Sequence, residues 1–150
     1  MGIGPGESVS DKAAATAQGK TERDRSKSDW VTQRFACSLP AVFKNLRLQI
    51  EEDVKTRNAL RPENAPYEFF IADKNGEFVV SVHSDGASKA VTFRLAPHAI
   101  LVGDDVGTSI FEITLSFSDQ GHCLLVVNNQ TLEDWQVRRL ALEDLLFAGN

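Results

Sequence analysis

The chain has 150 residues, 42% of them hydrophobic and 25% charged, with a formal net charge of -5. These values suit one globular domain. The acidic balance argues against a nucleic-acid partner, because phosphate backbones are bound by dense basic surfaces, and it argues weakly against an anionic membrane surface.

Residues 1–29 differ in composition from the rest of the chain. Between Ile3 and Trp30 they contain no leucine, isoleucine or aromatic residue, and their acidic and basic residues are equal in number. Such a segment buries too little to offset the entropy cost of ordering it, so we expect a disordered N-terminal arm. A passive tail is the favoured interpretation, with a tether or a modification site at Ser26 or Ser28 as the alternative. Residues 30–150 are expected to form a single α+β domain.

A helix is predicted from Ser38 to about Leu60. Ser38 is a good N-cap residue, Pro40 suits the first turn, and Pro62 ends the helix. One apolar stripe recurs at three- and four-residue spacing and comprises Phe43, Leu46, Ile50 and Val54.

About six strands follow, joined by short turns. Apolar and polar residues alternate over 67–72, 77–83, 91–95 and, most clearly, 109–117, with short apolar runs at 99–102 and 123–127. Asn75-Gly76 predicts a two-residue hairpin turn of the primed type, and Asp85-Gly86 predicts the next turn. Short turns imply antiparallel pairing. The run 123–127 is apolar at consecutive positions, which suits a central or doubly covered strand.

A second helix is predicted to close the domain. Thr131 is the expected cap, with Asp134 completing a capping box, and Gly149 is a late stop signal. The helix is apolar on most of its surface and should be largely buried. The fold class is therefore α+β with two layers, helix – antiparallel meander of about six strands – helix, and both helices on one face of the sheet.

The two cysteines, Cys37 and Cys123, are expected to be reduced. A bridge would require their Cα atoms to lie within about 7 Å of each other. No run reaches the length of a membrane span and the N-terminus lacks an apolar signal region, so we expect a cytoplasmic protein.

No metal ligand set or cofactor is expected. Neither cysteines nor histidines show zinc spacing, and the acidic turn from Gly103 to Gly107 lacks the ordered oxygen spacing of a calcium loop. We interpret that turn as solvated.

No catalytic residue is assigned either. His83, His98 and His122 are interpreted as exposed or turn residues, and the alternative is an enzyme that pairs one of them with a carboxylate, such as His83 with Asp85. His122 adjoins Cys123, but neighbours in a strand point to opposite faces.

Two groups of residues are candidates for binding. Trp135, Arg138 and Arg139 lie within one turn of the closing helix, and Trp and Arg are enriched at interface anchors. A core position for Trp135 is the competing and favoured interpretation. The second group is on the last predicted strand and comprises Cys123, Leu125 and Val127.

Three functional hypotheses follow. The first is a non-catalytic protein-interaction domain, which binds a protein partner or a second copy of itself through an open sheet edge or the strand face at 123–127. The second is a carrier of a small apolar ligand, held in a Phe-lined cavity between helices and sheet. The third is a small hydrolase-type enzyme with a His/carboxylate pair.

Overall fold

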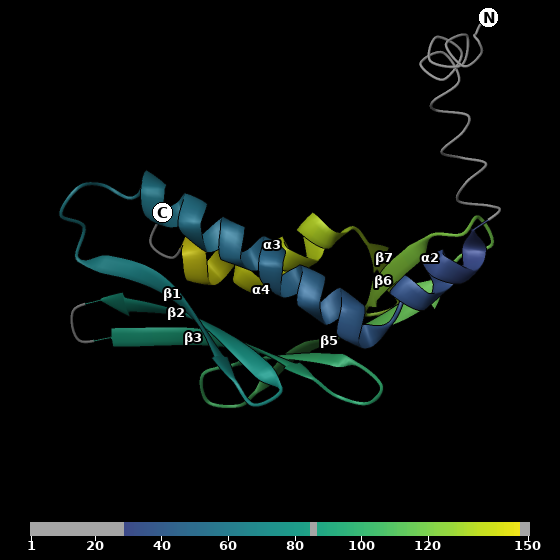
Figure 1. Cartoon of the computed structure of the whole chain (residues 1–150). Helices are drawn as coiled ribbons and strands as arrows, with labels where there is room; N and C mark the ends of the chain where they lie inside the picture. Colours follow the sequence, from purple (N-terminus) through teal and green to yellow (C-terminus); the bar gives the residue numbers. More distant parts are fainter. Residues whose placement is uncertain (1–28, 85–86, 148–150) are drawn as a thin grey trace, which may run out of the picture.

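The computed structural model describes residues 29–84 and 87–147 of the chain (Figure 1). The predicted arm up to residue 28, including Ser26 and Ser28, the turn at Asp85-Gly86 and the stop signal at Gly149 lie outside these residues. The described elements, in chain order, are α2 (Trp30–Ala36), α3 (Leu39–Leu60), β1 (Tyr67–Lys74), β2 (Glu77–Ser84), β3 (Ala87–Leu95), β4 (Ile100–Asp104), β5 (Ser109–Phe117), β6 (Cys123–Val127), β7 (Gln130–Leu132) and α4 (Asp134–Leu146).

The predicted fold class is confirmed. Within the described ranges the strands form one antiparallel sheet in the order β1-β2-β3-β4-β5-β6-β7, and α3 and α4 lie together over one of its faces (Figure 1). The first half of β5, up to Ile113, pairs with β4. The second half, from Thr114 to Phe117, pairs with β6. The β6–β7 hairpin is thereby displaced along β5, toward α2.

The long helix forms as its sequence predicts. Ser38 caps it by accepting a hydrogen bond from the backbone N–H of Ala41 at 3.4 Å, and a proline occupies the first turn. The predicted stripe faces the sheet: Leu46, Ile50 and Val54 are buried. Burying such a stripe stabilises the helix more than its intrinsic propensity does.

Aromatic rings fill the space between helices and sheet. Phe78 of β2 stacks on Phe93 of β3 with ring centroids 4.8 Å apart, and Phe43 of α3 packs on Phe78 at 5.2 Å. In β5 the predicted alternation is confirmed, with Phe111 and Ile113 buried and the intervening residues exposed.

One strand and its turn were missed by the prediction. Val127 pairs with Gln130 across Asn128 and Asn129, whose φ angles are 51° and 64°. Two consecutive positive φ angles are typical of a primed hairpin turn, and asparagine tolerates them better than most residues. At Asn75-Gly76 the two-residue hairpin forms as predicted, but the primed turn type is wrong, because both primed types require a positive φ at Asn75 and only Gly76 has one (70°).

The start and the burial of α4 also differ from the prediction. Thr131 lies in β7, and Glu133 is the N-cap, in a reciprocal capping box with Gln136. The helix is amphipathic rather than largely buried. Its sheet side buries Val137, Ala141, Leu142, Leu145 and Leu146, whereas Trp135 and Leu140 are about half exposed.

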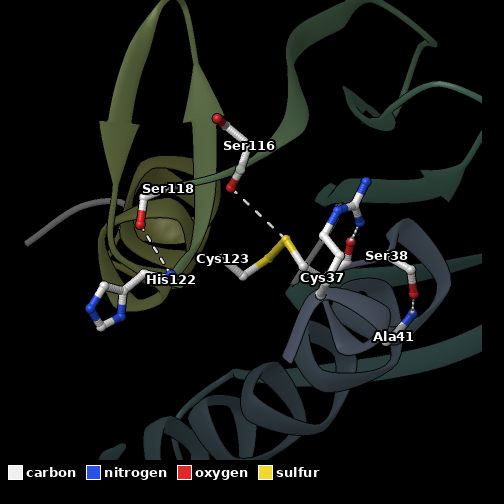
Figure 2. Close-up of a disulfide and its surroundings, with 8 residues drawn as sticks. Cys37, Ser38, Ala41, Ser116, Ser118, His122 and Cys123 are labelled. Atoms are coloured by element: carbon white, nitrogen blue, oxygen red, sulfur yellow. Dashed lines mark hydrogen bonds between the residues drawn. A yellow bond between two sulfur atoms is a disulfide. The ribbon is translucent and has the colours of Figure 1, made fainter. Parts of the chain in front are cut away.

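The expectation of two reduced cysteines is wrong. Cys37 and Cys123 form a disulfide between the end of α2 and the start of β6, with their Cα atoms 5.3 Å apart (Figure 2). They are separated by 86 residues in sequence, so nothing local signals their proximity. Cys37 Sγ also lies 3.9 Å from the carbonyl oxygen of Ser116.

The disulfide fastens a helix that was not predicted. α2 has seven residues and none of them is buried. Trp30, Val31 and Phe35 are 57%, 61% and 83% exposed. Arg34 also lies over the ring of Phe117 in β5, at 5.9 Å, and donates to the carbonyl of Cys37 at the end of its own helix.

Side chains at the C-terminal end of α3 pair with three backbone groups on the outer edge of β1. Asn58 donates to the carbonyl of Phe69 at 2.9 Å and accepts from its N–H at 3.0 Å. Arg61 donates to the carbonyl of Tyr67 at 2.9 Å. This part of the edge is a poor template for another strand, because these backbone groups are already paired.

An ion pair between Arg47 of α3 and Asp73 of β1 leads to a testable prediction about pH. Arg47 donates from Nε and Nη2 to the two carboxylate oxygens of Asp73, at 2.8 Å and 3.0 Å. This hydrogen bonding lowers the pKa of the Asp73 carboxyl from its ordinary value. The contribution of the pair to stability is therefore present above the pKa of an unfolded Asp and is lost as the pH falls through the lowered folded pKa.

We expect an NMR titration of the Asp73 carboxyl carbon to show a lower midpoint in the wild type than in Arg47→Gln. Arg139→Gln, which removes an exposed arginine from α4, serves as the control and should leave the Asp73 midpoint unchanged. Equal midpoints in the wild type and Arg47→Gln would contradict the assignment.

Candidate binding groove

A groove with a volume of about 410 Å³ lies between α3 and α4 on the surface of the helical layer. Its apolar lining comprises Leu60, Trp135, Leu142, Leu146 and Phe147. Leu142 and Leu146 are buried and form the floor, whereas Leu60, Trp135 and Phe147 are 72%, 50% and 50% exposed. Large apolar side chains that gather at one exposed place typically mark a binding surface.

Arg138 ties the two helices together beside this groove. Its Nη1 donates to Asp53 of α3 at 2.6 Å, and its Nε donates to Asp134, one turn earlier in α4, at 2.9 Å. Arg139, on the exposed rim, pairs with Glu143. Both arginines therefore have carboxylate partners within the fold.

Arg57 lines the same groove in a different environment. It is 9% exposed, and its Nε donates to the carbonyl of Leu146 at 2.7 Å, at the end of α4. Its guanidinium carbon lies 5.1 Å from the ring centroids of both Phe69 and Phe147, and 5.6 Å from that of Tyr67. No carboxylate of the described residues pairs with it.

The structure brings the first predicted group together. Trp135, Arg138 and Arg139 all line the groove. The favoured interpretation of Trp135 as a core residue is wrong, because half of its surface is exposed. Sequence reasoning missed Arg57, although a signal was present: Arg57 continues the buried stripe of α3, three residues after Val54, at a position where an apolar residue is expected.

The second predicted group does not form a comparable surface. Leu125 and Val127 point into the core and are 8% and 2% exposed, and the sulfur of Cys123 is bonded to Cys37. β6 lies between β5 and β7, which agrees with the predicted central strand, and its outer face, at Leu124 and Val126, is only partly buried. Cys123 and Leu125 do line a wide surface depression of about 730 Å³ between α2, α3 and the β6–β7 hairpin, but Val127 does not.

The histidines show no catalytic arrangement. His83, His98 and His122 are exposed, and in the described part of the chain none of their rings is hydrogen-bonded or ion-paired to an acid. His83 packs edge-on against Phe70, with ring centroids 5.1 Å apart. Asp85, its predicted partner, lies outside the described residues.

The acidic turn has a local structural role. Asp104 Oδ1 accepts hydrogen bonds from the N–H groups of Val106 and Thr108, at 3.1 Å and 2.8 Å, so this carboxylate organises its own turn. Across residues 29–84 and 87–147, no group of three or more His, Cys, Asp or Glu side chains is placed to hold a metal ion.

No protein-family model, no curated protein and no solved structure matches this chain. Within the described ranges, no helix is long and apolar enough to span a membrane. A functional proposal must therefore come from the groove itself.

Proposed function

We propose that this chain is a non-catalytic protein-interaction domain that takes an apolar segment of a protein partner into the groove between α3 and α4. The observation that supports it most is that three exposed apolar side chains, Leu60, Trp135 and Phe147, line one groove together with the buried Leu142 and Leu146. Interfaces that bind tightly combine a desolvated apolar centre with Trp and Arg anchors and a polar rim. Arg138 and Arg139 supply that rim.

The sheet offers less to a partner than this groove does. Strand addition at β1 would have to displace Asn58 and Arg61 from the backbone groups they already bond. At the other edge, β7 has only three residues. Main-chain pairing supplies affinity in strand addition, so a short or covered edge favours recognition through side chains instead.

A small-ligand carrier is the second candidate, at a new location. The carrier hypothesis requires Phe side chains to line a cavity between the layers, but Phe43, Phe78 and Phe93 pack against one another there. A volume of about 410 Å³ nevertheless falls within the range of small-molecule sites, so this candidate moves to the groove. The enzyme hypothesis gains no support from the exposed histidines.

The disulfide bears on the predicted cytoplasmic location. Disulfides persist in oxidising compartments and are uncommon in a reducing cytosol. The bond between Cys37 and Cys123 therefore favours an oxidising environment over the predicted one. Alkylation of free thiols at the moment of cell lysis, followed by mass spectrometry, distinguishes the two compartments. Alkylated Cys37 and Cys123 would show that both were reduced in the cell and would support the cytoplasm.

The groove can be tested by selecting displayed peptides on the purified domain and measuring their affinity by fluorescence anisotropy. We expect Trp135→Ala to weaken binding of the selected peptides by about 10- to 100-fold, because a Trp anchor is typically worth a few kcal/mol. Trp30→Ala is the matched control: Trp30 is similarly exposed, at 57%, but belongs to α2. It should leave the affinity unchanged.

Peptides whose affinity depends on Trp30 rather than Trp135 would overturn the proposal. So would a selection that yields no peptide while dodecanoate or dodecanol shifts the Trp135 indole resonance, since that result would indicate a small-ligand carrier.

A further inference from the structure

We infer that the groove recognises an acidic side chain, Asp or Glu, flanked by apolar residues in the partner segment, and that Arg57 binds its carboxylate. This inference rests on the proposed function and specifies the chemistry of the partner.

The charges around the groove single out Arg57. Arg138 donates to Asp53 and Asp134, and Arg139 pairs with Glu143, so both are neutralised inside the fold. Arg57 donates to a backbone carbonyl, lies against three aromatic rings, and makes no ion pair within the described residues. A buried charge is normally paired, because leaving it unpaired in a low-dielectric environment is costly.

Arg57 also keeps free donors toward the groove. A guanidinium has five N–H donors, and the Nε–H is committed to Leu146. The terminal nitrogens of Arg57 make no hydrogen bond within the described residues. They are also not among the fully buried side-chain atoms that lack a partner, since Nε of Arg61 is the one such atom in that part of the chain. The terminal nitrogens of Arg57 are therefore not fully buried, and Arg57 lines the groove.

A carboxylate is the group that fits these donors. The planar fork of Arg matches the two oxygens of a carboxylate, and such charge-assisted bonds are stronger than neutral ones. The aromatic rings around Arg57 hold the guanidinium in place, so little freedom is lost on binding. Its apolar neighbours in the groove, Leu60 and Phe147 among them, favour apolar residues beside the acid.

The shape of the site favours an acid within the segment over one at its end. The groove is open to the surface and is lined by both α3 and α4, so a bound segment needs no terminus there. A peptide also accounts for the spread of exposed apolar side chains, which reaches from Trp135, near the start of α4, to Phe147 at its end.

The test compares two blocked peptides, Ac-Ser-Leu-Phe-Glu-Leu-Leu-Ser-NH2 and the same peptide with Gln in place of Glu. Binding to the full chain is followed through the Trp135 indole N–H resonance, which is assigned with Trp135→Phe. We expect the Glu peptide to bind about tenfold more tightly, as expected for one charge-assisted hydrogen-bonded pair. The ratio should fall toward one below the pKa of the glutamate.

Variants of the arginines assign the preference to Arg57. Arg57→Gln should abolish the Glu/Gln ratio, whereas Arg139→Gln, on the rim of the same groove, should retain it. If Arg57→Gln does not fold, Arg57→Lys keeps the charge without the fork and should reduce the ratio. The ratio compares two ligands on one variant, so a general loss of stability does not imitate the effect.

The other outcomes separate the inference from the proposed function. Equal affinity of both peptides for the wild type, with both weakened by Trp135→Ala, would overturn the carboxylate preference and leave the groove intact. Tighter binding of the free acid Ac-Ser-Leu-Phe-Leu-Leu would assign the site to a chain terminus. Binding of dodecanoate with no response to any peptide at millimolar concentration would overturn the inference and the proposed function together.

Discussion

Replacing Cys37 and Cys123 together by alanine is expected to lower the free energy of unfolding by about 4 kcal/mol. The disulfide joins residues separated by 86 positions, so it restricts a large part of the unfolded chain. In the chain-entropy description, a loop of this size gives a stabilisation near the upper end of the usual range. Urea denaturation of the oxidised wild type and the double variant measures the difference.

Reduction of the wild type is the matched control, because it breaks the same bond without changing the sequence. Treatment with a phosphine reductant should shift the urea midpoint in the same direction as the double variant. An unchanged midpoint, with both thiols shown to be free by mass spectrometry, would contradict the prediction.

The same variant should loosen α2 selectively. A seven-residue helix without a buried residue is too short to be stable alone. Hydrogen exchange of the amides of α2 should therefore accelerate strongly when the disulfide is lost, while the amides in the middle of α3 follow only the change in global stability. This contrast separates a local tether from a general effect on the fold.

The parts of the fold that were predictable are those whose signals are local and periodic. The apolar stripe of α3 and the alternation in β5 each arise because one face of the element is buried. Both elements form as predicted. β7 was missed because three residues are too few to show a period, although Asn128-Asn129 marks its turn. The disulfide was missed because it depends on a contact 86 residues apart in sequence, which no local pattern reports.

The candidate site divides in the same way. Trp135, Arg138 and Arg139 were recognised as a possible anchor group because they lie within one helical turn. Their neighbours across the groove could not be predicted, since the pairing of α3 with α4 is set by the sheet beneath both helices. Arg57 is the instructive case: it occupies a position of the apolar stripe of α3, and of the three arginines that line the groove it is the one without a carboxylate partner among the described residues.

The packing between helices and sheet decides whether this space can also hold a ligand. Phe78 is 1% exposed and contacts both Phe93 and Phe43. We expect Phe78→Ala to lower the free energy of unfolding by about 3–5 kcal/mol, because it removes buried apolar surface and leaves a cavity that rigid neighbours cannot fill. Phe70→Ala is the control, since Phe70 lies on the outer face of the sheet and is 43% exposed. It should cost much less.

The size of this loss discriminates between the binding module and the interlayer carrier. In a closely packed interior, the removal of even one methylene lowers the stability. A natural ligand cavity already contains space, so truncation of its lining costs less. A loss below about 1 kcal/mol for Phe78→Ala would therefore show that the rings do not fill the interlayer space. In that case the carrier hypothesis would return to its original place between the layers, and the groove between α3 and α4 would have to compete with it.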